Sequence, residues 1–504
     1  LTETEMHVIV FRPGKAVVSS EFPVIEPPST ISLDGEWEFE LKPTLDNRFG
    51  DFHWPPTKAL IGAEARRMRY ADEVSPDPRW KEPGFDDSKW REVTCGFGPR
   101  FWKLGPFPAN VDADAQLAGL REVDPSKPIR IGGKDYHWEP YEFSWRYGIP
   151  GDCGRQGYHG LKIRVMDEFI GLGGIQHGHP GCNRVAEKEG SRYYLWTAVD
   201  APKAGPTPIS SGGMLPAKAW LGGRELDTTA ATTGLTKGAN ALLLRYDKPG
   251  RGWLVFGTAK RPQAPAKDKP LPWNTDLAMT WLDEPGRLGF DTRPATPHPV
   301  GWYRFTAPPG LHGLHLPCES KPRVWVDGNE AAPTGSPGAW SVKLDAPVRN
   351  APIVAIRLEQ QRGEYGGAAF SDYIRLDCGP GKITAGDWSK LGVLETYSGA
   401  AWYRRNIELT GADISKRTIL DLGKVVSSAE VHLNGKLIGI RTSPPWTFDL
   451  TGKLRAGENR LEVLVCNTLS NHYVTIPTHY RGELDSGLIG PARLLVSPEP
   501  PATR

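Results

Sequence analysis

A loop near the C-terminal end of the sequence gathers side chains that could do acid–base chemistry. Residues 478–486 have the sequence Thr-His-Tyr-Arg-Gly-Glu-Leu-Asp-Ser, with His479, Glu483 and Asp485 close together. Hydrolysis of a glycosidic bond needs two carboxyl groups, about 5 Å or about 6.5–9.5 Å apart, one of them kept protonated as an acid. Glu483 and Asp485 are therefore candidate catalytic carboxylates, with His479 beside them. The alternative is a solvated loop that contacts a neighbouring domain.

A second cluster of reactive side chains lies in a glycine-rich segment. A cysteine and a histidine occur within 153–160, and Asp167, Glu168, His177 and His179 follow. Imidazoles and carboxylates can bind a metal ion or a network of sugar hydroxyls. His177 and His179 lack the i, i+4 spacing of a helical zinc site, and a glycine-rich loop offers no rigid frame for ligands. Loop hydrogen bonding is the favoured interpretation, and no metal ligand is assigned.

Aromatic side chains are abundant, with 18 Trp and 15 Tyr. Flat aromatic faces suit the cores of β-sandwiches and also stack against the C–H faces of sugar rings. Candidates for sugar contact are the aromatic residues that lie in Gly- and Pro-rich segments outside the regular strands. They are Trp102, Trp138, Trp145, Tyr158 and Tyr480.

Several other classes of function lack their signatures. There is no Gly-x-Ser-x-Gly elbow, no Walker-type loop and no dinucleotide fingerprint between a strand and a helix. The six cysteines show no Cys-x-x-Cys spacing, and a disulfide between Cys153 and Cys182 is a hypothesis that the sequence alone leaves open. The formal charge is +2, from 61 basic and 59 acidic residues, so neither nucleic acid nor an anionic membrane is favoured as a partner. No window of about 20 apolar residues predicts a membrane-spanning helix.

The elements that position these residues repeat three times along the chain. Each copy has an aromatic strand, a strand that ends in a tight turn, and an apolar strand that follows a Gly, Ala or Asn. Such repetition predicts several copies of one β module. The copies are 193–196, 219–223 and 238–244; 302–305, 324–328 and 353–358; and 402–405, 431–435 and 457–463.

Within each copy, the side-chain pattern predicts antiparallel strands. Polar and apolar residues alternate in 431–433 and in 460–463, which puts one face of each strand toward a core. Asp327-Gly328 and Asn434-Gly435 are dipeptides favoured in two-residue hairpins, where both central residues need a positive φ. We therefore expect an all-β protein of tandem antiparallel jelly-roll sandwiches, with these dipeptides as turn formers.

At 504 residues the chain is long enough for about three domains. We expect residues 1–27 to be the end of a preceding β-domain and a linker, because 7–12 alternate like a last strand without a partner. The first sandwich is predicted over 28–260, with a long insertion at about 100–192, the second over 273–380 and the third over 381–504. Strands do not alternate with helices, so a (β/α)₈ barrel does not fit this chain.

Several motifs resemble the galactose-binding-like jelly-roll module that accompanies glycoside hydrolases of the family 2 type. The third module matches this jelly-roll module along almost its whole length. In detail the chain is similar to the C-terminal half of family-106 glycoside hydrolases, the α-L-rhamnosidases. The motifs are Leu33-Asp34-Gly35-Glu36-Trp37, Phe85-Asp86-Asp87-Ser88-Lys89-Trp90, Ser398-Gly399-Ala400-Ala401-Trp402-Tyr403-Arg404-Arg405, Val431-His432-Leu433-Asn434-Gly435, Pro445-Trp446-Thr447-Phe448-Asp449 and Ser486-Gly487-Leu488-Ile489-Gly490-Pro491.

The resemblance implies a carbohydrate-active protein whose catalytic carboxylates lie on an N-terminal barrel. No segment here matches that barrel, so no catalytic residue is transferred. The implied partners are an oligo- or polysaccharide substrate and an N-terminal catalytic segment of the same protein. No cofactor is required, a structural calcium ion is plausible by resemblance, and a bacterial protein of this kind is expected in the periplasm or outside the cell.

Three hypotheses follow. In the first, the chain is the ancillary β-sandwich half of a glycoside hydrolase that acts on rhamnose-containing glycans. In the second, it is a carbohydrate-binding protein without catalysis. In the third, it is a lyase or hydrolase whose site lies within the 100–190 insertion or in the loop at His479–Asp485.

Overall fold

The computed structural model describes residues 28–46, 59–108, 110–125, 127–143, 191–213, 215–247, 252–256, 289–291, 300–361, 364–475 and 483–497. Over these residues the fold is almost entirely β, with antiparallel pairing between the strands, which confirms the predicted all-β class of tandem sandwiches. The α-helices in the described ranges are two single turns, α1 (Asp114–Leu117) and α4 (Gly411–Ile414). None of the described helices is long and apolar enough to cross a membrane.

The three sequence repeats form two six-stranded sheets and one seven-stranded sheet, with the same strand order at their centre. In each sheet the aromatic strand pairs with the apolar strand, and the apolar strand pairs with the strand that enters the hairpin turn. The predicted turn residues have the required positive φ, at 48° for Asp327 and 52° for Asn434. The predicted repeat and its turns are therefore confirmed. Both could be predicted because they depend on local side-chain patterns.

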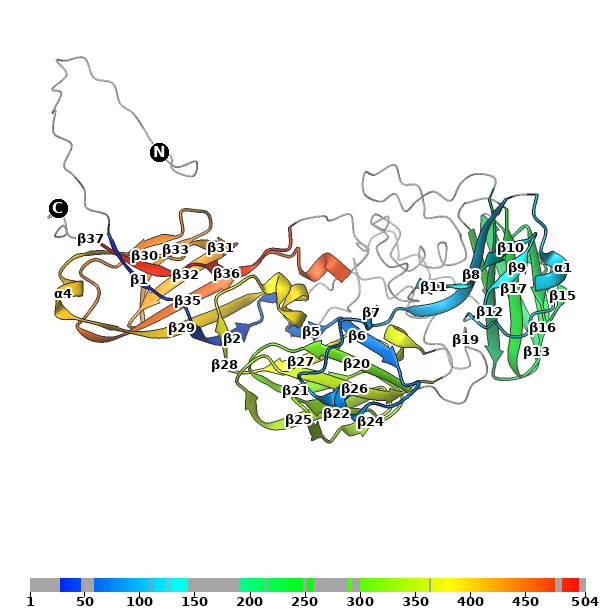
Figure 1. Ribbon diagram of the computed structural model, residues 1–504, viewed down its shortest axis with the longest axis horizontal. Coiled ribbons are helices and arrows are strands. Elements are labelled where there is room, and N and C mark those ends of the chain that lie inside the picture. The colour runs from blue at the N-terminus through cyan, green and yellow to red at the C-terminus, as the bar shows by residue number, and fades with distance from the viewer. Residues whose placement is uncertain are drawn as a thin grey trace, which may run out of the picture.

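We name the three units the C-terminal, middle and inserted sandwiches (Figure 1). The C-terminal sandwich has a six-stranded sheet of β28 (Gly381–Thr384), β2 (Glu36–Lys42), β29 (Ala400–Leu409), β35 (Gly457–Cys466), β32 (Ser428–Leu433) and β33 (Lys436–Arg441). Its second sheet contains β1 (Ser29–Ser32), β37 (Arg493–Ser497), β30 (Arg417–Asp421) and β34 (Thr447–Asp449), and β31 (Lys424–Val426) pairs with β36 (Gly487–Gly490).

The middle sandwich repeats this plan. Its six-stranded sheet contains β23 (Asn329–Ala331), β22 (Arg323–Val326), β26 (Ile353–Glu359), β20 (Val300–Thr306), β6 (Arg67–Asp72) and β7 (Arg91–Thr94). Its five-stranded sheet contains β24 (Thr334–Ser336), β25 (Ala339–Val348), β21 (Leu311–Leu316), β27 (Ile374–Cys378) and β5 (Ala63–Ala65). The short pair β3 (Leu45–Asp46) and β4 (Leu60–Ile61) lies on the chain between the two sandwiches.

The inserted sandwich has a larger sheet of β11 (Glu139–Phe143), β8 (Gly98–Pro108), β12 (Ser191–Ala201), β17 (Gly238–Tyr246), β14 (Lys218–Leu221) and β15 (Arg224–Glu225), with β19 (Gly289–Asp291) beside β12. Its smaller sheet contains β16 (Thr232–Leu235), β13 (Gly205–Gly213) and β18 (Gly252–Phe256). The pair β9 (Ile129–Ile131) and β10 (Lys134–Tyr136) belongs to the segment that follows α1.

The strand pairing nests the three sandwiches inside one another. β2 pairs with β28 and β29, so the C-terminal sandwich takes its first strands from before the other two units. β5 and β6 pair with β27 and β20, so the middle sandwich is in turn interrupted by the inserted one. In Figure 1 the blue strands β1 and β2 accordingly lie among yellow and red ones.

This pairing divides residues 28–260 differently from the sequence analysis, which placed them in one sandwich with an insertion. The described residues of that range supply strands to all three units. The ranges 273–380 and 381–504 do contain the later strands of the middle and C-terminal sandwiches. The expected end of a preceding domain at 1–27 lies outside the described residues.

The hydrophobic cores follow the nesting. One continuous cluster of buried residues runs through the C-terminal and middle sandwiches, and includes Trp37 and Trp388 of the former and Tyr303 of the latter. The inserted sandwich has separate clusters between its sheets and on the outer face of its larger sheet. Apolar burial contributes roughly 25 cal/mol per Å², so the continuous cluster stabilises the C-terminal and middle sandwiches as one body.

Candidate functional site

Several side chains that the sequence singled out lie outside the described residues. These are His479 and Tyr480 of the C-terminal loop, Trp145 and Tyr158 among the aromatic candidates, and the cluster of Cys153, Asp167, Glu168, His177 and His179, together with Cys182. Their proposed roles remain predictions.

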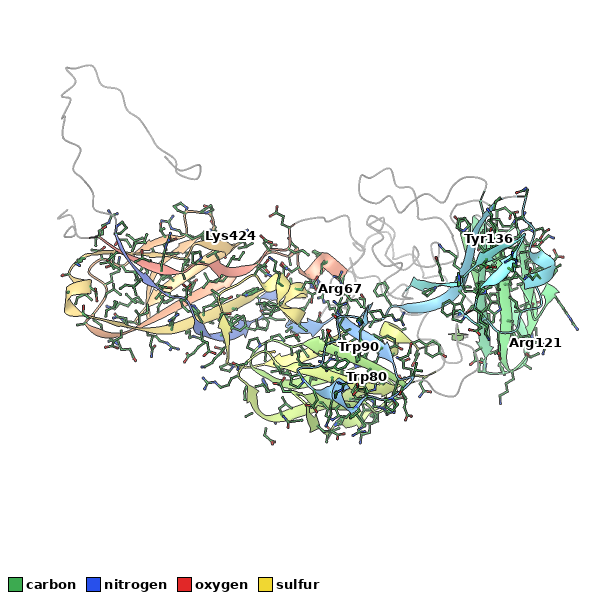
Figure 2. All side chains as sticks on the ribbon, viewed as in Figure 1. Arg67, Trp80, Trp90, Arg121, Tyr136 and Lys424 are labelled. Carbon is green, nitrogen blue, oxygen red and sulfur yellow. The ribbon has the colours of Figure 1, made fainter. Side chains whose placement is uncertain are left out.

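Glu483 and Asp485 lie at the edge of the C-terminal sandwich, before β36. Lys424 on β31 is labelled in Figure 2. Its Nζ is 2.7 Å from Oδ2 of Asp485, and this ion pair raises the pKa of Lys424. Asp485 is 42% exposed and Glu483 is exposed. Both carboxylates thus lie at a solvated edge, and one of them is bound to a lysine of the same sandwich.

Two of the aromatic candidates belong to the inserted sandwich. Trp138 is 4% exposed and fills the cluster on the outer face of the larger sheet, so its ring packs inside the protein. Trp102 lies on β8 and packs, half-buried, against the same cluster. The segment 110–138, which carries α1, β9 and β10, covers this sheet face, and buried Leu117 belongs to the same cluster.

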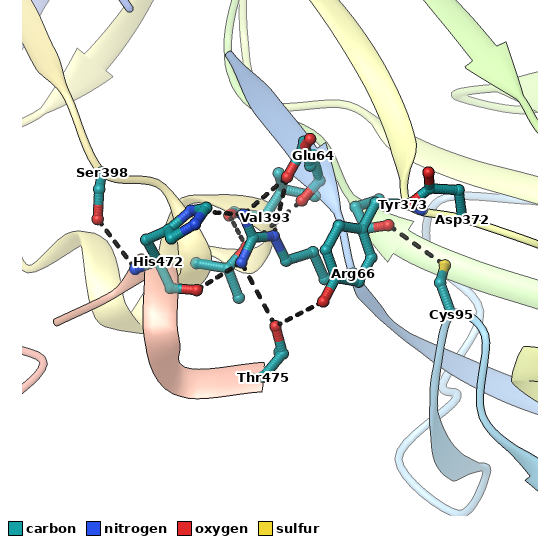
Figure 3. Close-up of polar contacts among 11 residues, drawn as sticks. Glu64, Arg66, Cys95, Asp372, Tyr373, Val393, Ser398, His472 and Thr475 are labelled. Carbon is teal, nitrogen blue, oxygen red and sulfur yellow. Dashed lines mark hydrogen bonds and ion pairs between the residues drawn. The ribbon is translucent and has the colours of Figure 1, made fainter. Parts of the chain in front are cut away.

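A buried polar cluster joins the middle and C-terminal sandwiches (Figure 3). Arg66 follows β5 and is 2% exposed. It donates through Nε and Nη2 to Oε2 of Glu64, at 3.0 and 2.7 Å. From the C-terminal sandwich, the carbonyl oxygen of His472 accepts from Nη1 at 2.5 Å and Nδ1 of His472 accepts from Nη2 at 2.8 Å. The guanidinium thereby ties two sandwiches together.

Aromatic and hydroxyl groups complete the surroundings of this cation. The Arg66 guanidinium carbon lies 4.6 Å from the ring centroid of Tyr373, and Thr475 Oγ1 is 3.4 Å from both Nη1 of Arg66 and the hydroxyl of Tyr373. Burial raises the pKa of Glu64, while the neighbouring Arg66 acts in the opposite direction. Because every group here is bonded and enclosed, the cluster suits a structural latch better than a reaction centre.

A cavity of about 820 Å³ opens beside this cluster, on the outer face of the five-stranded sheet of the middle sandwich. Glu64, Asp372 and Tyr373 line one side of it, and β21 and β27 supply much of its floor. The chain near β4 and the turn before β25 form further walls. Its size lies within the roughly 300–1,000 Å³ typical of small-molecule sites.

At alternate positions of the strands, polar side chains point out of the sheet into this cavity. His315 and Asp377 are about half exposed, and Nε2 of His315 lies 2.9 Å from Oδ2 of Asp377 on the next strand. Arg375 stands on the same face of β27, where it is exposed between buried Ile374 and Leu376. Carboxylate, imidazole and guanidinium groups on one open face can accept and donate hydrogen bonds together.

Sequence reasoning missed both the latch and the cavity. The alternation in β27 predicts that Arg375 and Asp377 face away from the core, but not which strand lies beside them. Nothing in the local sequence marks Arg66 as buried. Within the ranges that the structure describes, no group of three or more His, Cys, Asp or Glu side chains is placed to hold a metal ion.

Comparison with known proteins gives partial matches. No family model matches the sequence. A stretch of 83 residues is 35% identical to a "putative beta-glucuronidase" of Formosa agariphila, covering 16% of this chain and 7% of that protein.

Solved structures give low-scoring matches. A rhamnosidase from Novosphingobium sp. PP1Y matches at 20% identity with a TM-score of 0.22, over 40% of this chain and 23% of its own. A beta-glucuronidase of an uncultured Clostridium sp. matches at 26% identity with a TM-score of 0.20, over 24% of each chain. This chain therefore spans a small part of the curated relative and about a quarter of these structures.

Proposed function

We propose that this chain is the ancillary β-sandwich portion of a glycoside hydrolase that acts on rhamnose-containing glycans. The observation that carries the proposal is the 83-residue stretch that is 35% identical to a protein named as a beta-glucuronidase. The resemblance to family-106 enzymes, which includes the opening Val8-Ile9-Val10-Phe11-Arg12, favours rhamnose as the sugar. The role of the sandwiches is to support a catalytic segment and to hold part of its glycan substrate.

The described carboxylates support an ancillary role over catalysis. Glu64 is bound by Arg66, Asp485 by Lys424, and Asp377 lies against His315. A general acid needs a carboxyl that stays protonated and that reaches the substrate, whereas Glu64 is enclosed. The catalytic pair is therefore assigned to a segment outside the described residues. A periplasmic or extracellular location and a structural calcium ion belong to the same proposal.

The experiment is a turnover assay on a panel of aryl glycosides that includes α-L-rhamnoside. The 504-residue chain should release no aryl alcohol, whereas a longer protein that carries the upstream segment should do so with the rhamnoside. Turnover by the chain alone would overturn the ancillary role and direct attention to Glu483 and Asp485. Replacing both by Ala would then locate the activity, with Lys424→Ala as a control that removes only the ion-pair partner.

A binding measurement with rhamnose-containing glycans, made beside the turnover assay, tests the hypothesis of a non-catalytic carbohydrate-binding protein. If the longer protein binds rhamnose-containing glycans but cleaves no member of the panel, the chain belongs to a non-catalytic carbohydrate-binding protein. Circular dichroism and intrinsic tryptophan fluorescence would establish that each sample is folded before a negative result is accepted.

A further inference from the structure

The cavity on the middle sandwich has the chemistry of a binding site. Its floor is the outer face of a regular sheet, so the side chains that enter it are held at fixed spacing by strand pairing. His315 is paired in register with Arg375 on one side and with Ser341 on the other. Glu64 of β5 is in turn the register partner of Arg375. A row of four polar side chains therefore crosses the floor from one strand to the next.

A glycine in the floor makes room for one of these groups. A Cβ atom on Gly313 would lie 2.6 Å from Oδ2 of Asp377, closer than atoms can pack. Gly313 pairs with Asp377, next to a register shift in β21. The absence of a side chain at Gly313 lets the Asp377 carboxylate lie across the strand and reach His315 at 2.9 Å. Both groups remain about half exposed, so each keeps hydrogen-bonding capacity toward the cavity.

Apolar groups supply the other part of the surface. Leu60 lines the cavity and is 53% exposed. Ile61 and Trp340 also line it. A few directed polar groups combined with apolar wall are typical of small-molecule sites, and a sugar ring presents both hydroxyls and C–H faces.

The charges around the cavity select among saccharides. The carboxylates of Asp372 and Asp377 line it, whereas the Glu64 side chain at its edge is buried and bound to Arg66. The cations on the same side are Arg375 in the lining and Arg66 behind Glu64. A uronate or a sulfated sugar would bring a further negative charge against this excess, which costs binding energy. A neutral saccharide brings only hydroxyls. Carboxylates accept hydrogen bonds from these groups, and Arg375 and His315 donate hydrogen bonds to them.

We propose that the cavity bounded by β5, β27, β21 and β25 binds a neutral oligosaccharide, with Asp377 and His315 as a hydrogen-bonding pair for vicinal hydroxyls. The proposal rests on the proposed function and adds the place and the charge class of the glycan. Asp377 accepts hydrogen bonds from hydroxyls, His315 and Arg375 donate to sugar oxygens, and the wall at Leu60 contacts C–H groups.

Titration calorimetry on the full chain tests this assignment. The probes are a neutral rhamnose-containing oligosaccharide and an acidic one that contains glucuronate. The variants Asp377→Ala and His315→Ala change half-exposed groups on a sheet surface, so they should fold. Matched controls come from the exposed pair of Arg323 and Glu330, which is similar in exposure and lies on β22 and β23 of the opposite sheet.

We expect the wild-type chain to bind the neutral probe more tightly than the acidic one. Asp377→Ala and His315→Ala should each weaken binding about ten-fold or more, because each removes a side chain that forms hydrogen bonds with the sugar hydroxyls. Glu330→Ala and Arg323→Ala should bind as wild type. Gly313→Ala, which displaces Asp377, should weaken binding as well.

Three outcomes that would contradict the proposal can be told apart. If wild type binds the neutral probe and the Asp377 and His315 variants bind equally well, this cavity is not the site, while the proposed function stands. If wild type binds neither probe, both this assignment and the glycan-holding role of the sandwiches are wrong. Preference for the acidic probe overturns the charge argument and favours a uronate-binding site.

Discussion

The outer faces of two six-stranded sheets, in the middle and the C-terminal sandwiches, show how one template is used in two ways. Strand pairing places Trp302 and Trp402 at equivalent positions, followed two residues later by Arg304 and Arg404. Across the sheet, Trp325 and His432 are also equivalent, because each immediately precedes the residue before a hairpin turn. The backbone pairing and the Trp and Arg positions agree, but the two faces differ in how they are covered.

In the middle sandwich the face is covered. Trp302 and Trp325 stack with ring centroids 5.1 Å apart and are 6% and 4% exposed. The loop that carries η1 (Pro78–Lys81) lays Trp80 over them, with its centroid 5.7 Å from that of Trp302, and Trp90 packs against Trp80 (Figure 2). Arg304, 1% exposed, donates to Asp87 at 2.8 Å and binds the loop's carbonyl groups.

In the C-terminal sandwich the equivalent face carries a network of ion pairs. Arg404 donates to Glu40 at 2.6 Å and to Glu462 at 3.1 Å, and it is 22% exposed. The ring of Trp402 meets His432 edge-on at 5.6 Å. Glu462 occupies the position between Arg404 and His432 that Ala355 occupies in the middle sandwich. An alanine there admits a covering loop, whereas a glutamate supplies charge to a solvated surface.

The difference indicates that burial, not residue type, sets the energetic role of each position. Multidomain chains do not unfold in one two-state step. Local opening must therefore be measured separately in each sandwich, by hydrogen exchange with mass spectrometry on peptides from β20 and β29. The following substitutions test the comparison in that assay.

The largest effect is expected from removing the equivalent tryptophans. Trp302→Ala should lower the opening free energy of the middle sandwich by about 3–5 kcal/mol, since it leaves a cavity beneath Trp80. Trp402→Ala should lower that of the C-terminal sandwich by about 1–2 kcal/mol, because its site borders solvent. Similar losses at both sites would show that the covering loop adds little.

The equivalent arginines should differ next. Arg304→Ala removes the buried guanidinium that donates to Asp87 and to the carbonyl oxygen of Glu82. These acceptors lose their partner, so we expect the opening free energy of the middle sandwich to fall by about 3 kcal/mol. Arg404→Ala breaks partly exposed pairs and should cost about 1 kcal/mol or less. Lys at 304 would not restore stability, since it lacks the planar fork that serves several acceptors. Full rescue by Arg304→Lys would contradict this account.

A carboxylate beside Trp302 should make the covered face sensitive to acid. Glu73 accepts from Arg357 at 2.7 and 2.8 Å and from Nε1 of Trp302 at 2.5 Å. The hydrogen bonds from Arg357, followed by that from Trp302, lower the pKa of Glu73, against the effect of its burial. Its stabilisation is therefore present above the usual pKa of a glutamate and is lost as the pH falls through the lowered value in the folded protein.

Glu73→Gln should thus destabilise the middle sandwich by about 1–2 kcal/mol near neutral pH. The difference from wild type should stay constant from neutral pH down to the usual glutamate pKa of about 4, and shrink as the pH falls further through the lowered pKa in the folded protein. Hydrogen exchange on β20 peptides, corrected for the intrinsic pH dependence, gives the comparison. A difference that stays constant as the pH falls below about 4 would mean that the glutamate acts through shape and not through charge.

The smallest effect is expected at the rim of the open face. Arg460 of β35 pairs with Glu38 of β2, and both side chains are exposed in part. Arg460→Ala should change the opening free energy of the C-terminal sandwich by less than about 1 kcal/mol, and salt should reduce that difference further. A larger loss that persists in high salt would show that the open face depends on this pair.

Much of the fold could be predicted from sequence because its signals are local. The turn dipeptides Asp327-Gly328 and Asn434-Gly435 and the alternation in β35 need only neighbouring residues to be recognised. The nesting could not be predicted, because the first strand of each of the three large sheets pairs with a strand far along the chain. These first strands are Glu36–Lys42, Arg67–Asp72 and Gly98–Pro108. Alternation gives the face of a strand but not its partner.

The candidate sites were harder to predict for the same reason. Trp138 lies in a Gly-rich segment and resembles a surface aromatic residue, yet Leu117 and Ile131 around it share a buried cluster. The spaced apolar residues of that segment could have indicated that it packs against a sheet. The pairing of His315 with Asp377 joins strands that are 62 residues apart, and Arg66 with His472 are 406 residues apart, so no local pattern reveals either contact.

The central claim is that these sandwiches hold a neutral glycan and leave its cleavage to another segment. One NMR experiment on the 504-residue chain with a rhamnose-containing oligosaccharide tests both parts, through saturation transfer to the sugar and the appearance of new anomeric signals. The account predicts saturation transfer and no new reducing end over a long incubation. New reducing ends, or a complete absence of transfer from a folded sample, would contradict it.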